Sequence, residues 1–245
     1  MSAARTPKRH MSFLCLVLAL LVILSTQARA DLFGFAPVSD NSGTSGALAA
    51  QLSVEVTPYA ENGTDQVLFT FYNDGPLDSG YDVTDPIDGI ITGVYFDDGA
   101  LLGISTIIEA PPDVDFQHPA KGHENFAEGA SLEPPFETTA GFSASVQKGK
   151  KGVAKGVNSG ESLGIVFDLK DGYNFAGVIN SIGLGWTDPW HQQSLRIAVR
   201  VQAFGEDGGF SGALLHAPTP GALVLGTIGI GMVIVRLRRR ILAES

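Results

Sequence analysis

The sequence contains a single cysteine, Cys15, among 245 residues. One thiol cannot form an intramolecular disulfide, and it cannot supply a zinc-thiolate set or an iron–sulfur cluster. Positive charge is also scarce, because 16 Lys and Arg stand against 26 Asp and Glu. Residues 31–217 hold eight of these basic side chains and twenty-five of the acidic ones, a net charge of −17. A body with this charge repels phosphate backbones, so nucleic acid is excluded as a partner.

The basic residues that the body lacks gather at the two ends of the chain. Near the start, a basic segment precedes an apolar run at residues 13–24, which is too short for a relaxed membrane span. Ala28 and Ala30 then give the small-x-small pattern that signal peptidase recognises. The sequence therefore predicts a signal peptide over residues 1–30, cleaved before Asp31, with signal peptidase as a partner. The alternative is an uncleaved anchor helix.

The other end of the chain combines a breaker, a short apolar segment and a basic cluster. Residues 221–235 carry no charge, and as a helix they would span about 22 Å of the roughly 30 Å of membrane hydrocarbon. The breaker consists of Pro218, Thr219 and Pro220, and the cluster consists of Arg236, Arg238, Arg239 and Arg240. Arg and Lys mark the cytoplasmic side of a membrane, so both ends place residues 31–217 outside the cytoplasm. The sequence predicts a short transmembrane helix and transient membrane association, with a permanent tail anchor as the alternative.

This C-terminal arrangement resembles a PEP-CTERM sorting signal, with Thr219 where that family has glutamate. The resemblance implies that residues 218–245 are a sorting and anchor segment recognised by an exosortase-like membrane protease. It also implies a bacterial protein that is membrane-tethered before processing and lies at the cell surface or outside the cell afterwards. Within the body, residues 91–104, 160–169 and 195–202 resemble recurrent segments of an uncharacterised, β-rich group of such exported proteins.

The body itself has the residue pattern of β-strands. Apolar and polar residues alternate over residues 51–56, 67–72, 90–96, 101–108, 136–146, 163–169 and 195–204. Apolar residues at helical spacing occur only over residues 174–182, which predicts at most one short helix. Short strands separated by many glycines and prolines predict an all-β domain over residues 31–217, an antiparallel β-sandwich. A jelly-roll-like strand order is compatible with this pattern.

Two groups of side chains in the body are candidates for binding. Trp186 and Trp190 lie close together, and aromatic rings exposed on a loop can stack on sugar rings; packing in the core or at its rim is the alternative. An acidic segment carries Asp74, Asp78, Asp82, Asp85 and Asp88, interrupted by glycine and proline that forbid a helix. Such loops can supply the oxygen ligands that calcium needs, although solvated carboxylates are the simpler interpretation.

Motifs for catalysis are weak. Residues 160–164 match G-x-S-x-G, but a nucleophile elbow needs a helix after Ser162, whereas a strand is expected there. The sequence therefore favours a non-enzymatic, exported bacterial protein of the cell surface or extracellular matrix, without a cofactor unless calcium binds. The alternatives are a carbohydrate-binding module acting on extracellular polysaccharide and a secreted hydrolase.

Overall fold

The computed structural model describes residues 30–38, 45–61, 64–73, 89–97, 99–110, 113–120, 125–147, 153–204 and 210–218. In chain order its elements are β1 (Asp31–Pro37), α2 (Ser45–Gln51), β2 (Leu52–Glu61), β3 (Thr64–Asn73), β4 (Ile90–Phe96), β5 (Leu101–Ala110), η1 (Gly129–Ser131), β6 (Ser143–Ser145), β7 (Glu161–Leu169), α4 (Phe175–Thr187), β8 (Ile197–Phe204) and β9 (Phe210–Pro218). Among the described residues, no helix has the length and apolar character needed to cross a membrane.

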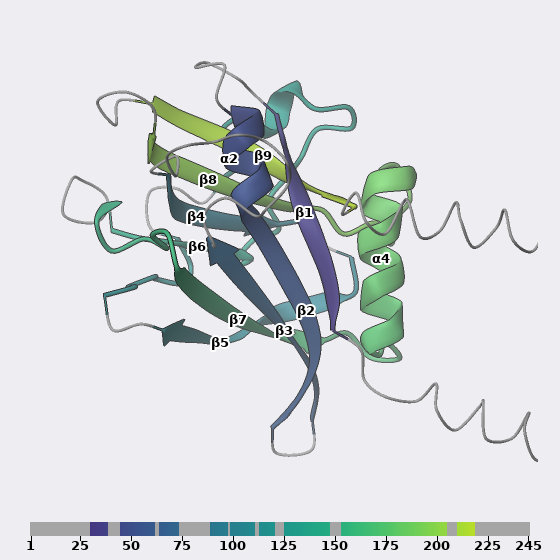
Figure 1. The fold of residues 1–245 in the computed structure, drawn as a ribbon. Coiled ribbons are helices and arrows are strands. Elements are labelled where there is room, and N and C mark those ends of the chain that lie inside the picture. Colours follow the sequence, from purple (N-terminus) through teal and green to yellow (C-terminus); the bar gives the residue numbers. More distant parts are fainter. Residues whose placement is uncertain are drawn as a thin grey trace, which may run out of the picture.

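The nine strands form one curled antiparallel sheet in the order β5-β7-β3-β2-β1-β9-β8-β4-β6 (Figure 1). The prediction of an antiparallel β-protein is confirmed, but the prediction of two separate sheets is wrong. The reason is β1, which joins the two halves: Asp31 to Phe33 pair with β2, and Phe33 to Pro37 pair with β9. Neither β1 nor β9 was expected from the sequence.

Aromatic rings fill the interior of the curled sheet and hold its two halves together. Phe96 of β4 lies 4.6 Å from Phe167 of β7 and 5.1 Å from Phe69 of β3, measured between ring centroids. Phe142, beside β6, lies 5.4 Å from Phe167. These edge-to-face pairs each contribute about 0.5–1.5 kcal/mol beyond the burial of their area. The two halves therefore face each other across the core as the sheets of a sandwich do.

Among the described residues, two α-helices accompany the sheet. In α4, the Asn174 side chain accepts a hydrogen bond from the Gly177 N–H at 3.0 Å and caps the first turn. Val178 and Ile182 of α4 are buried in the core. The predicted helix is thus present and extends to Thr187. The prediction of at most one short helix is wrong, because α2 forms a second one that buries Leu48 completely.

The predicted strands are recovered unequally. β4 has the expected bounds, and β2, β3, β5 and β7 extend beyond theirs. The strand expected over residues 136–146 shrinks to β6, because the preceding segment makes local loop bonds: the Phe136 N–H donates to the Gly129 carbonyl. The predicted domain boundary after residue 217 falls inside β9, since Pro218 still pairs with Phe33.

Candidate functional site

The site develops where α4 turns back toward the sheet. Gly185 makes this return compact, because a Cβ at this position would lie 2.2 Å from the Leu195 carbonyl oxygen. The Leu195 N–H donates to the Ser181 carbonyl at 2.8 Å, which joins the returning chain to the helix. Residues 188–194 therefore form a short excursion with both of its ends fixed.

Hydrogen bonds within the excursion fix its shape as well. The Asp188 N–H donates to the Leu184 carbonyl at 2.8 Å, and the His191 N–H donates to the Asp188 carbonyl at 3.0 Å. The Ser194 hydroxyl donates to the Pro189 carbonyl at 3.1 Å. The backbone of a loop held in this way has little conformational entropy left to lose on binding.

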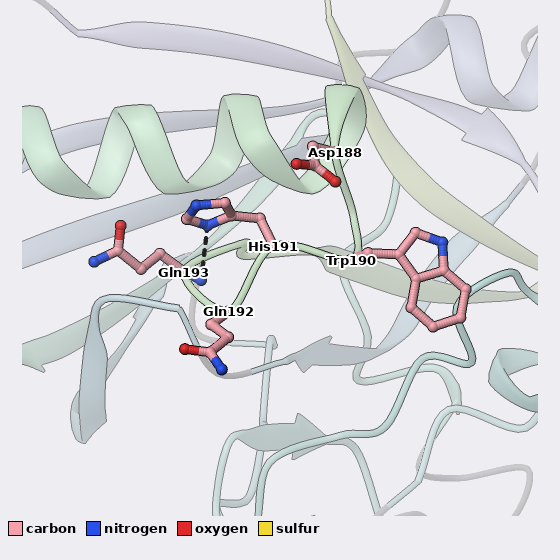
Figure 2. A pocket seen from close by; sticks show the side chains of 5 residues that line it. All are labelled: Asp188, Trp190, His191, Gln192 and Gln193. Carbon is pink, nitrogen blue, oxygen red and sulfur yellow. Dashed lines mark hydrogen bonds between the residues drawn. The ribbon is translucent and has the colours of Figure 1, made fainter.

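A pocket of about 630 Å³ opens on this loop and is lined by Asp188, Trp190, His191, Gln192 and Gln193. Figure 2 shows the Trp190 ring at one end of the loop and Gln193 at the other, with Gln192 between them. Trp190 is 69% exposed. His191 Nδ1 accepts from the Gln193 N–H at 3.1 Å, so the neutral ring carries its hydrogen on Nε2.

A second pocket of about 340 Å³ adjoins the first and shares Gln192 with it. Its other lining residues come from two separate parts of the chain: Asp97, Pro135, Glu137, Thr138, Thr139, Ser194 and Arg196. The two pockets, which have only Gln192 in common, are together called the depression. Polar side chains outnumber apolar ones in its lining, and the indole of Trp190 is the most exposed large apolar side chain there.

A buried ion pair lies at the floor of the second pocket. Arg196 Nε donates to Asp97 Oδ2 at 2.6 Å, and the remaining guanidinium nitrogens donate to the Pro134 carbonyl at 2.7 Å and the Pro135 carbonyl at 2.8 Å. The guanidinium also lies over the Phe136 ring, 5.2 Å from its centroid. Each guanidinium nitrogen thus has an acceptor, and the charge of the arginine is paired with Asp97 within the protein.

A buried histidine ties α4 to the sheet beneath the site. His216 Nδ1 accepts from the Ile197 N–H at 3.0 Å, and Nε2 donates to the Ile182 carbonyl at 3.1 Å. The first bond requires the neutral ring, because Nδ1 can accept only while it carries no hydrogen, and the second bond places the ring's one hydrogen on Nε2. Burial away from water lowers the pKa of His216 to about 4. The helix that carries the loop is therefore fixed to β8 and β9 through an uncharged imidazole.

Family models, curated proteins and solved structures gave no match to this chain. The function therefore has to be inferred from the residues of this chain and their geometry. Of the two predicted tryptophans, Trp190 lines the first pocket, whereas Trp186 lies on α4 and lines neither pocket. Trp186 is 46% exposed, so neither indole is buried in the core.

The other candidate residues lie largely beyond the part of the chain that the structure describes. This applies to Ala28, to Thr219 and Pro220, to the arginine cluster at Arg236, Arg238, Arg239 and Arg240, and to the acidic residues Asp74, Asp78, Asp82, Asp85 and Asp88. Ala30 is described and exposed, and Pro218 is the last residue of β9. Within the described ranges, no group of three or more His, Cys, Asp or Glu could hold a metal ion. Calcium binding by the acidic segment stays a prediction.

Most of the depression was not identified from the sequence. Glu137 and Thr139 meet Gln192 only because the chain folds them together, and no motif joins these positions. One signal was available, since Gln192 and Gln193 directly follow the Trp190–His191 pair. The G-x-S-x-G match lies elsewhere: Ser162 is within β7, where it pairs with Tyr72 and Ala110, so no helix follows it as a nucleophile elbow requires.

Proposed function

We propose that this is an exported, non-enzymatic protein of the bacterial cell surface or extracellular matrix, sorted through residues 218–245. The observation that supports the proposal is the pairing of β1 with β9, in which Phe33 lies opposite Pro218. Because the two strands are antiparallel, the start of β1 and the end of β9 lie at the same end of the sheet. The expected signal peptide and the expected sorting segment would therefore both leave the body toward one membrane.

The proposed processing has two steps, each by a membrane protease. Signal peptidase cuts after Ala30, and the new N-terminus, Asp31, is the first residue of β1. An exosortase-like protease then acts beyond Pro218, which leaves β9 intact in the sheet. Neither cut removes a residue that pairs within the sheet, so the body keeps its fold.

Intact mass and subcellular fraction of the native protein test this proposal. We expect a mass that begins at Asp31 and ends close after Pro218, found at the cell surface or outside the cell. A variant that replaces the four arginines of the cluster, Arg236, Arg238, Arg239 and Arg240, with glutamine should keep its C-terminal segment. A native protein that retains residues 1–30 would contradict cleavage by signal peptidase, and one that stays in the cytoplasm would contradict export.

A second candidate function is carbohydrate binding, favoured by the exposure of both tryptophans. An exposed indole lowers the solubility of the protein and adds nothing to the stability of its core. A sugar ring that stacks on the indole would cover its apolar face. Binding of the native protein to soluble polysaccharides, read from its mobility in native gels that contain them, tests this candidate. Unchanged mobility in every polymer would contradict it.

A further inference from the structure

The two adjoining pockets have the composition of a sugar site more than that of an apolar ligand site. We propose that the Trp190 groove, made of Trp190, Gln192, Gln193, Ser194, Glu137 and Thr139, binds a polysaccharide chain without acidic groups. This inference rests on the carbohydrate-binding candidate and adds where the ligand lies and which class of polymer it is. It also separates the two tryptophans, because Trp186 lies outside the groove.

The indole of Trp190 is the platform of the groove. It is the most exposed large apolar side chain among the described residues, at 69%, and it stands on a loop that backbone hydrogen bonds hold in place. A planar ring fixed in this way can stack against the C–H face of a pyranose. The exposed aliphatic residues Leu32 and Leu102 offer no such flat face.

The amides beside the platform supply polar contacts of the right kind. Within the described part of the chain, the side chains of Gln192 and Gln193 make no hydrogen bond, so their donors and acceptors face solvent. Each amide offers an N–H₂ group and a carbonyl oxygen, which match the donor and acceptor roles of neighbouring sugar hydroxyls. Gln192 lines both pockets, so consecutive sugar units of one chain would lie on either side of its amide.

The charges that line the groove select against acidic polymers. Asp188 and Glu137 contribute two carboxylates, and the guanidinium of Arg196 is already paired with Asp97. A uronic acid or phosphate group placed here would meet negative charge without a free permanent cation to offset it. A neutral polysaccharide pays no such penalty.

Affinity electrophoresis of the native protein tests the groove and the ligand class together. The probes are hydroxyethylcellulose and galactomannan as neutral polymers and alginate as the acidic one. We expect retardation by at least one neutral polymer and none by alginate. The variants W190A and Q192A should bind that polymer roughly tenfold more weakly or worse, the loss typical of truncating a central binding residue.

W186A is the matched control, because it removes an exposed indole outside the groove, and we expect it to bind like the wild type. All three variants change exposed side chains, so their melting temperatures should equal that of the wild type. Neutral-polymer binding that survives in W190A and Q192A would overturn the groove and leave the carbohydrate-binding candidate standing. Stronger retardation by alginate would overturn the ligand class, and no retardation by any polymer would overturn the groove and the candidate together.

Discussion

Lowering the pH should destabilise this protein through one buried side chain, His216. In the folded state its ring must stay neutral so that Nδ1 can accept from the Ile197 N–H, while Nε2 donates to the Ile182 carbonyl. In the unfolded chain the same ring binds a proton below its usual pKa of 6.5. Between pH 6.5 and about 4 the unfolded state therefore holds more protons, and stability falls as the pH falls through this window.

The size of the effect follows from the two pKa values. The difference between 6.5 and about 4, at about 1.36 kcal/mol for each pH unit, amounts to about 3 kcal/mol for the whole window. About 2 kcal/mol of this loss is expected by pH 5, relative to pH 7. A loss of this size is a large fraction of the stability of a typical domain.

Urea unfolding followed by far-ultraviolet circular dichroism, at pH 7, 6, 5 and 4.5, measures this loss. The variant H216N keeps an acceptor for the Ile197 N–H but cannot be protonated, so its free energy of unfolding should fall less over the same range. H191N is the matched control, because it removes an exposed imidazole and leaves the buried one in place. If H216N and the wild type lose stability in parallel between pH 7 and 4.5, the assignment to His216 is refuted.

Three further substitutions test other parts of the fold. D97N should cost about 3–5 kcal/mol, because it leaves the buried Arg196 guanidinium without its counter-charge; a loss under 1 kcal/mol in urea unfolding would contradict the pair's role. G185A should lower the melting temperature clearly, because its methyl group would collide with the Leu195 carbonyl; the exposed G183A serves as the control and should raise the melting temperature slightly, because alanine favours the helix and meets open space there. F167A should cost about 3–5 kcal/mol by opening a cavity between the two halves of the sheet, and a chevron or melting curve unchanged from the wild type would argue against that aromatic core.

Strands with local signals could be predicted from the sequence, and strands that depend on distant partners could not. β4 has clean β-branched and aromatic residues and matches its expected bounds. β1 contains Gly34 and Pro37, and β9 contains Gly212 and ends at Pro218, which lower the strand propensity of both. They form because they pair with each other, although they stand at opposite ends of the body in the sequence.

Two further differences have local causes. α2 was hidden because glycine and serine around Ser45 suggest a flexible segment, whereas the fold has room to bury Leu48. The segment before β6 alternates as a strand does, yet it turns into a loop where Phe136 bonds to Gly129. Phe136 and Phe142 of the expected strand are buried, but burial does not alternate along it and only Ser143–Ser145 pair as a strand.

The candidate site was partly visible in the sequence. Trp190 was recognised because the chain has only two tryptophans and they lie close together in the sequence. The contribution of Glu137 and Thr139 could not be, since these residues approach Gln192 only through tertiary folding. Sequence alone also treated Trp186 and Trp190 as equivalent, whereas the structure assigns only Trp190 to a pocket.

The position of β1 between β2 and β9 has a consequence for the order in which the fold is completed. A chain that emerges N-terminus first, from a ribosome or a translocation channel, presents β1 early and its partner β9 last. Until residues 210–218 have emerged, β1 can pair only with β2, and its other edge, at the centre of the final sheet, stays unpaired. Contacts this distant in sequence form slowly. The last strand to emerge therefore joins the two halves of the sheet. The body cannot reach its final fold while any of its strands is still in the ribosome or the channel.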